Sequence, residues 1–153
     1  ETGPLARCAS HPIIKMHNEI YGYSIYVRTI ARLIELAQIP QTLQDIMNGS
    51  AQENESAFCQ THSLGEHGVV GSIETARGKL YHRGIIRQKK VVKYDILSPS
   101  QWNFHSTSIA SVLLSNHALH PSLNWDEKVR TTNLIMHAID PCVAFEVREQ
   151  QNA

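Results

Sequence analysis

Hydrophobic residues recur at helical spacing in the first quarter of the chain. Within residues 19–38 the apolar side chains lie three or four positions apart, which predicts a helix with one buried stripe. These inward positions are Ile20, Tyr23, Val27, Ile30, Ile34 and Ala37. Proline lacks a backbone N–H and clashes with the preceding helical turn, so Pro40 is predicted to end this helix. A short helix at 42–47 is expected next, with Asn48 and Gly49 as its stop.

The pattern in the middle of the chain is typical of loops and strands. Residues 48–68 are polar and rich in Gly, Ser and Asn, so a loop is predicted there. Residues 69–97 contain short β-branched and aromatic stretches interrupted by Gly78 and by Arg-Gln-Lys-Lys, which predicts two or three antiparallel strands. The proline-containing stretch at 98–103 is predicted to be a turn, and the one at 3–7 a turn or loop.

Two further helical patterns occupy the last third of the chain. The first, at 104–119, is predicted to turn four apolar residues inward, namely Ile109, Val112, Leu113 and Leu119. The second, at 124–139, has Asn124 or Asp126 as its expected N-cap. We expect this helix to pack against the helix at 19–38, because each has one apolar stripe that needs a partner. The predicted fold class is therefore α+β, mainly helical, with one small antiparallel sheet.

Composition indicates a single globular domain spanning residues 1–153, with 42% hydrophobic and 18% charged residues. Fourteen Lys and Arg residues balance fourteen Asp and Glu residues, so nucleic acid is not an expected partner. Apolar runs are too short to predict a membrane span. Three widely spaced cysteines, Cys8, Cys59 and Cys142, favour a reducing compartment over a disulfide framework, and we expect a cytoplasmic protein.

Three stretches could support chemistry, and each has a structural alternative. Arg77 lies at a predicted strand bend, where its guanidinium could bind a small anion or simply face solvent. Pro99 begins a turn whose Ser100 hydroxyl and backbone N–H groups could bind an anionic ligand, or serve the turn alone. The Asp-Pro pair at 140–141 interrupts the last helix and leaves Cys142 at a bend, although a free cysteine is more often an inert core residue.

Four motifs occur in order along the chain. Residues 3–7 read Gly-Pro-Leu-Ala-Arg, 74–82 read Glu-x-x-Arg-Gly-x-Leu-x-His, 99–103 read Pro-x-x-Trp-Asn, and 137–142 read His-x-x-Asp-Pro-Cys. Together they resemble the C-terminal half of the large subunit of NiFe hydrogenases. The resemblance implies a large-subunit-like fold whose small sheet lies around 69–97. It also implies that the chain is a fragment lacking the N-terminal half.

The resemblance assigns roles to particular residues. In that family four thiolates hold a nickel and an iron, and the iron also carries cyanide and carbon monoxide. Cys142 corresponds to a terminal nickel ligand and is the metal candidate of this chain. Arg77, Pro99 and Ser100 correspond to the pocket for the diatomic ligands, and cyanide in a dry pocket does need hydrogen-bond donors. Weaker candidates are Cys8, Glu74, His82 and His137.

Departures from the family pattern change the expected function. Phe145 stands where the second, bridging thiolate should be, and phenylalanine cannot bind a metal. Arg148 replaces the last histidine of the motif, and Ala76 replaces the proline before Arg77. A chain that keeps the iron pocket and loses the bridging thiolate resembles hydrogenase maturation proteins of the HupK/HoxV type. These are non-catalytic scaffolds or carriers for the iron–cyanide–carbonyl unit during large-subunit assembly.

The implied cofactor is thus a transient iron–cyanide–carbonyl unit, with nickel not expected and no metal expected in recombinant protein. The implied partners are hydrogenase maturation proteins, with the hydrogenase large subunit as a further candidate. Two alternatives stay open. One is a divergent large subunit or hydrogen sensor that binds nickel and iron, which Phe145 opposes. The other is a metal-free structural or interaction relative of the large subunit.

Overall fold

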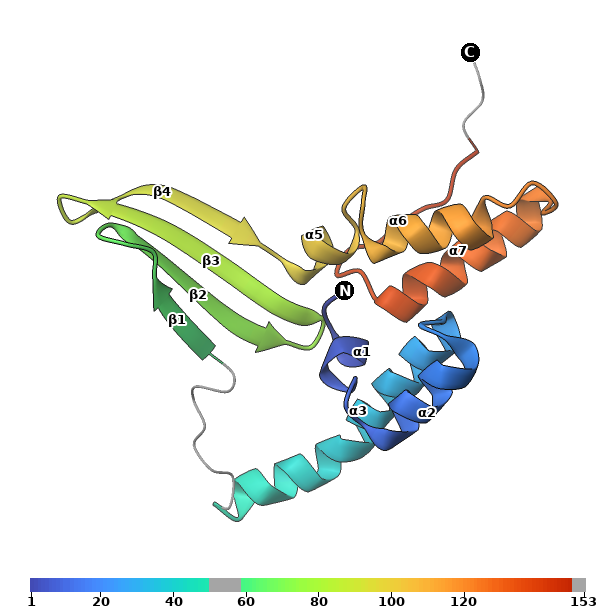
Figure 1. The fold of residues 1–153 in the computed structure, drawn as a ribbon, viewed down its shortest axis with the longest axis horizontal. Coiled ribbons are helices and arrows are strands. Elements are labelled where there is room, and N and C mark those ends of the chain that lie inside the picture. Colours follow the sequence, from blue (N-terminus) through green and yellow to red (C-terminus); the bar gives the residue numbers. More distant parts are fainter. Residues whose placement is uncertain (50–58, 150–153) are drawn as a thin grey trace.

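The structure, a computed structural model, describes residues 1–49 and 59–149 and is α+β, as predicted (Figure 1). Along the sequence, helices precede and follow an antiparallel sheet, and in space the sheet extends away from the two groups of helices. The helices are α1 (Pro4–Arg7), α2 (Pro12–Tyr21), α3 (Ile25–Met47), α5 (Pro99–Asn103), α6 (Ile109–Leu113), the π-helical turn η1 (Leu114–Ala118) and α7 (Trp125–Ile139). The strands are β1 (Cys59–Ser63), β2 (Gly68–Thr75), β3 (Gly78–Arg87) and β4 (Lys90–Leu97).

The predicted helix at 19–38 is wrong at both ends. Gly22, with a φ of 60°, ends α2, and the Ser24 side chain caps the start of α3. Pro40 lies inside α3, so the separate helix expected at 42–47 is the last part of the same helix. The second half of α3 is largely exposed, and water can therefore satisfy the carbonyl group that loses its N–H partner at Pro40.

Both predicted turns that contain proline are short helices. Pro4 occupies the start of α1 and Pro99 the start of α5, where the missing N–H has no helical partner to lose. At α5 the Ser98 hydroxyl accepts from the Gln101 N–H at 3.1 Å, and the Gln101 side chain accepts from the Ser98 N–H at 2.9 Å. This reciprocal capping box stabilises a helix of only five residues.

The sheet is a four-stranded antiparallel meander in the order β1-β2-β3-β4. Strands β2 to β4 occupy 68–97, which confirms the sheet expected around 69–97. The loop predicted at 48–68 is wrong for β1, where Cys59 pairs with Ile73 and Ser63 with Val69. Every side chain of β1 is exposed. Backbone pairing to β2 therefore holds this strand, and its hydrophobic pattern gives no signal. Residues 48–49 and 64–67 of that predicted loop lie outside helices and strands, as expected, and 50–58 lie outside the described residues.

The helix predicted at 104–119 is shorter and irregular. It begins at Ile109 and passes into the π-helical turn at Leu114. Two of its expected inward residues, Val112 and Leu119, are exposed. The helix at 124–139 is confirmed within one residue. Asn124 is its N-cap, and it forms a capping box with Glu127.

Two small hydrophobic clusters hold the helices together. The first joins α1, α2 and α3 and contains Leu5, Cys8, Ile14, Val27 and Ala31. The second joins α6, η1 and α7 and contains Ala110, Leu113, Ala118, Ile135 and Ile139. Helices α3 and α7 contact each other, which confirms the predicted packing of the two longest apolar patterns. At this contact Arg32 Nη1 donates to the His137 carbonyl oxygen at 2.5 Å.

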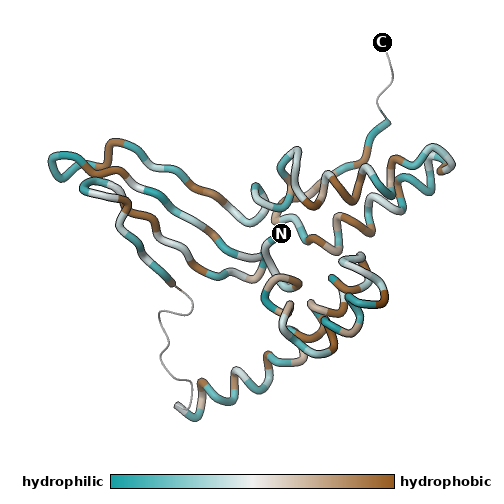
Figure 2. The backbone as a smooth tube through the Cα atoms, in the orientation of Figure 1, coloured by the Kyte–Doolittle hydropathy of each residue, from teal (hydrophilic) through white to brown (hydrophobic). Residues whose placement is uncertain are grey.

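Many apolar side chains lie on the surface. The sheet extends away from the helices, and the second half of α3 projects beyond its neighbours (Figures 1 and 2). Ile20 and Tyr23, predicted to point inward, are exposed because the helix is interrupted between α2 and α3 at this point. Ala37, also predicted to point inward, is exposed on the projecting half of α3. Along α3 an exposed stripe continues at helical spacing through Leu36, Ile39, Leu43 and Ile46. None of the helices in the described ranges is long and apolar enough to cross a membrane.

Candidate functional site

Arg77 lies in the turn between β2 and β3, as predicted. The turn reverses the chain at Gly78, whose φ of 127° disfavours any residue with a side chain. Arg77 Nε lies 3.4 Å from Asp140 Oδ2, at ion-pair distance. This Nε atom is buried and makes no hydrogen bond to any of the described residues. The side chain as a whole is 41% exposed, so the outer part of the guanidinium stays open to a ligand.

Asp140 ends α7 in a left-handed conformation, with φ 63° and ψ 72°. Its N–H donates to the Met136 carbonyl at 2.8 Å, which closes the last turn of the helix. The carboxylate is also 3.7 Å from Arg32 Nη2. Left-handed backbone costs a non-glycine residue about 1–2 kcal/mol. Attraction to the guanidiniums of Arg32 and Arg77 offsets part of this cost and orients the bend that follows.

The bend brings Cys142 to the start of α5. The Cys142 N–H donates to Ser100 Oγ at 3.3 Å. Pro99 beside it is buried, and Ser100 is half-buried. The stretches around Arg77, Ser100 and Cys142, far apart in the sequence, therefore meet at the C-terminal end of α7. The roles of these residues toward a ligand stay a prediction.

The thiol of Cys142 is more open than the sequence suggested. Cys142 is exposed, so it is not the inert core residue that the sequence left open, and Phe145 is only half-buried. Residues 141–149 form neither helix nor strand and follow the surface beyond α7. The Phe145 ring lies edge-on to the exposed His137 ring, with centroids 5.9 Å apart and an interplanar angle of 69°.

The weaker candidates have partners of their own. Glu74 Oε1 accepts from Arg7 Nη1 at 2.6 Å, and His82 Nδ1 lies 2.6 Å from the Tyr94 hydroxyl. Cys8 is buried in the first hydrophobic cluster. Burial raises the pKa of the Cys8 thiol, and the nearby carboxylate of Glu35 raises it further. A neutral buried thiol is a poor metal ligand, so Cys8 is a packed residue in this structure.

Sequence reasoning missed three charged residues that hold these parts together. Asp140 and Arg32 orient the bend before Cys142, and Arg7 binds the strand that leads to Arg77. Two of the three stand inside motifs already noted, Arg7 in Gly-Pro-Leu-Ala-Arg and Asp140 in Asp-Pro-Cys. That position was the available signal. In the described ranges, 1–49 and 59–149, no three His, Cys, Asp or Glu side chains gather closely enough to hold a metal ion.

Comparison with known proteins confirms the resemblance found in the motifs. Residues 13–148 match the family model for nickel-dependent hydrogenase. The chain is 29% identical to the hydrogenase expression/formation protein HupK of Bradyrhizobium diazoefficiens over 121 residues, covering 78% of the chain and 32% of the relative. It is 35% identical to HupK of Azotobacter vinelandii over 117 residues, covering 73% and 33%.

An enzyme subunit is also among the relatives. The chain is 25% identical to sulfhydrogenase 2 subunit alpha of Pyrococcus furiosus over 145 residues, which covers 95% of the chain and 34% of the relative. The chain spans about a third of the length of the curated relatives it matches.

Proposed function

The chain belongs to the nickel-dependent hydrogenase family, and from that premise we propose that it is a non-catalytic maturation factor. Its cargo is the iron–cyanide–carbonyl unit, held during assembly of a hydrogenase large subunit. Relatives named as hydrogenase expression/formation proteins support a maturation-related role. The proposal extends that role to binding, and to a fold that corresponds to the C-terminal part of the large subunit.

One observation supports binding more than any other. The chain brings a single exposed thiol, Cys142, to the same bend as Arg77 and Ser100, while Phe145 occupies the position of the second thiol. An iron that already carries diatomic ligands needs few ligands from the protein. One thiolate then anchors the metal, and the neighbouring groups act as hydrogen-bond donors to the cyanides.

The charge around the bend suits an anionic cargo. Arg32 and Arg77 each place a guanidinium near the Asp140 carboxylate, so two positive charges face one negative charge and one positive charge remains. The Arg77 Nε is buried against the Asp140 carboxylate, while the Arg77 side chain as a whole is 41% exposed. A bound cyanide nitrogen would accept from the exposed part of this guanidinium, and a charged donor in a partly buried site makes a stronger bond than a neutral one.

Phe145 fits a carrier better than an enzyme. A bridging thiolate would help hold a second metal, whereas a phenyl ring binds none. A single thiolate also releases its cargo more readily than a chelating pair. We further propose a cytoplasmic location, where reducing conditions keep Cys142 as a free thiol, and contact with other hydrogenase maturation proteins.

The test is infrared spectroscopy with metal analysis on protein purified from a cell that contains the hydrogenase maturation machinery. The proposal expects carbon monoxide and cyanide stretching bands with iron and without nickel. Cys142→Ser should lose them, whereas Cys59→Ser, which changes another exposed cysteine, should keep them. Bands accompanied by nickel would indicate a large subunit or a sensor. No bands and no iron would indicate a metal-free relative, and either result would refute the carrier.

A further inference from the structure

The guanidinium of Arg7 joins three elements that surround the Arg77 turn. It forms a paired contact with Glu35 on α3, Nε to Oε1 at 2.5 Å and Nη2 to Oε2 at 2.8 Å. Nη1 donates to the Glu74 carboxylate at 2.6 Å and to the Thr75 carbonyl at 2.9 Å. Nη2 also donates to the Ala76 carbonyl at 2.9 Å.

These five bonds use all the donors that an arginine has. Two of them end on the carbonyl groups of Thr75 and Ala76, immediately before Arg77. These two bonds therefore restrict the backbone of the turn itself, and they do so directly and not only by holding strand β2 in place. The two carboxylates hold the guanidinium itself in one orientation, which also raises the pKa of Arg7 above its already high ordinary value.

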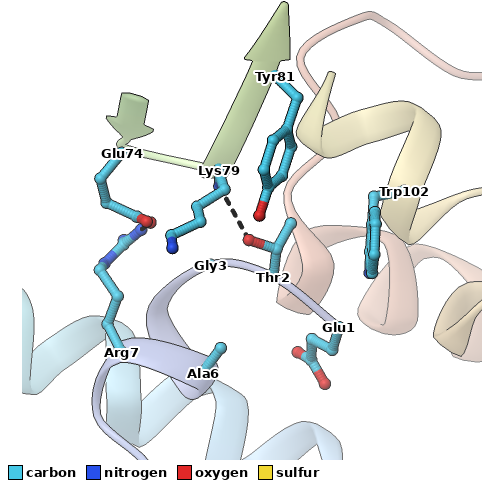
Figure 3. A pocket seen from close by; sticks show the side chains of 9 residues that line it. All are labelled: Glu1, Thr2, Gly3, Ala6, Arg7, Glu74, Lys79, Tyr81 and Trp102. Atoms are coloured by element: carbon cyan, nitrogen blue, oxygen red, sulfur yellow. Dashed lines mark hydrogen bonds and ion pairs between the residues drawn. The ribbon is translucent and has the colours of Figure 1, made fainter. Parts of the chain in front are cut away.

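Thr2 links the same turn to α5. Its hydroxyl accepts from the Lys79 N–H at 2.8 Å, just after the turn (Figure 3). On its other side the Thr2 backbone makes a reciprocal pair with the buried Asn103 side chain. The Thr2 N–H donates to Asn103 Oδ1 at 2.9 Å, and Asn103 Nδ2 donates to the Thr2 carbonyl at 2.8 Å. Asn103 is the last residue of the helix that begins with Pro99 and Ser100.

Two glycines show how closely these parts approach. A Cβ atom on Gly3 would lie 2.9 Å from the Arg77 carbonyl oxygen, and a Cβ atom on Gly78 would lie 2.5 Å from the Thr2 hydroxyl. Both residues also have a positive φ that favours glycine. The segment 2–7 therefore fits directly against the turn, beside a pocket of about 270 Å³ whose walls include Glu74, Lys79, Tyr81 and Trp102 (Figure 3).

We infer that Thr2 and Arg7 are positioning residues that fix the Arg77 turn relative to α5. This inference rests on the proposed function, because Arg77 and Ser100 are the donors proposed to face the cargo. Arg7 holds the turn by donating to the Thr75 and Ala76 carbonyl groups. Thr2 sets the separation between the turn and α5. Neither residue needs to touch the cargo. Without them the Arg77 guanidinium and the Ser100 hydroxyl would no longer face a common ligand at a fixed distance.

The first experiment uses metal-free protein and follows the Arg77 side-chain Nε–H signal by nuclear magnetic resonance. Thr2→Val keeps the side-chain shape and removes the acceptor for the Lys79 N–H, so exchange of the Arg77 Nε–H with water should become at least about tenfold faster. Arg7→Lys keeps the charge, but an ammonium group cannot span both carboxylates and both carbonyls. We therefore expect this variant to accelerate exchange of the Arg77 Nε–H more than Thr2→Val does.

Two control variants separate positioning from general stability. Thr2→Ser keeps the hydroxyl and should restore the wild-type exchange rate. Lys93→Met removes an exposed ion pair with Asp95 on the same sheet and should leave the Arg77 signal unchanged. If Thr2→Val and Arg7→Lys lower the melting temperature yet leave the Arg77 signal as in wild type, both residues are merely structural and the inference is wrong.

The second experiment uses protein loaded with its cargo. Thr2→Val and Arg7→Lys should shift the cyanide stretching bands of the wild type, and Lys93→Met should not. Unchanged bands in both variants would overturn the inference while leaving the proposed function intact. Absence of bands from the wild type itself would overturn the proposed function, and the exchange measurement on metal-free protein would still decide whether Thr2 and Arg7 position the turn.

Discussion

Replacement of Phe145 by cysteine restores the second thiol of the Cys-x-x-Cys pattern and tests what the phenyl ring does. In the metal-free protein the Phe145 ring is half-buried and meets the His137 ring edge-on. Cysteine is smaller and makes no such aromatic contact. We therefore expect Phe145→Cys to lower the free energy of unfolding of the metal-free protein while increasing its affinity for soft metal ions.

The size of the loss follows from the burial of the ring. Complete burial of a phenylalanine side chain contributes about 2–3 kcal/mol, and Phe145 is only half-buried, so about 1 kcal/mol is at stake. The edge-on contact with His137 adds about 0.5 kcal/mol, at the low end for aromatic pairs because the His137 ring is exposed. Cysteine recovers part of the burial. The expected loss is therefore about 1 kcal/mol, without a large added cost for desolvating a thiolate, since Cys142 is exposed.

The assay compares urea unfolding and Zn²⁺ and Ni²⁺ titration of the variant with those of its parent. Cys59→Ser serves as the common background, because an exposed third thiol would bind metal between molecules. Phe145→Leu is the matched control, which keeps most of the apolar volume and adds no thiol. We expect Phe145→Cys to bind Zn²⁺ at least about tenfold more tightly than Phe145→Leu, since two thiolates on one short segment chelate the ion.

If Phe145→Cys has the same unfolding curve as its parent and the same Zn²⁺ affinity as Phe145→Leu, position 145 does not face the same space as the Cys142 thiol. The correspondence of Phe145 to a lost metal ligand would then be wrong in three dimensions, whatever the motif suggests. If Phe145→Cys loses stability without gaining Zn²⁺ affinity, position 145 again does not correspond to a lost metal ligand. Burial of apolar surface alone would then explain why phenylalanine stands there.

Three other outcomes are expected. Burial raises the pKa of the Cys8 thiol in the folded protein, so the neutral thiol contributes its full stability below about pH 8.5, the ordinary thiol pKa. This contribution is lost as the pH rises through the folded pKa. In urea unfolding, the difference in stability between wild type and Cys8→Ala should therefore shrink at alkaline pH. Arg28→Ala should cost about 3 kcal/mol by the same assay, since Arg28 is 2% exposed and its loss leaves Glu1 without its partner; a cost below about 1 kcal/mol would contradict this. Asn124→Ala should cost about 1 kcal/mol by removing the acceptor for the Glu127 N–H, seen as a lower melting temperature, whereas an unchanged temperature would mean that the capping box contributes nothing.

The site could be predicted from the sequence as far as its motifs reach. Arg77 before Gly78, Ser100 after Pro99 and Cys142 after an Asp-Pro break were recognisable as candidates, and the structure brings their stretches together. What could not be read was the exposure of the Cys142 thiol. Exposure of the thiol depends on which segments of the folded chain cover the bend, and the local pattern of residue types does not specify those segments.

The sequence alone was enough to predict four features: the α+β class, the sheet at 69–97, the helix at 124–139 and the family. This was possible because periodicity, capping residues and motif order can be read directly along the chain. Tertiary structure decided the rest. Strand β1 has no exposed-to-buried alternation and exists only because β2 offers its edge. The bonds from Arg7 to Thr75 and from Lys79 to Thr2 join residues 68 and 77 positions apart. Such contacts form only when the packed helices bring the N-terminal segment, the turn and α5 into one place, so no window of sequence can specify them.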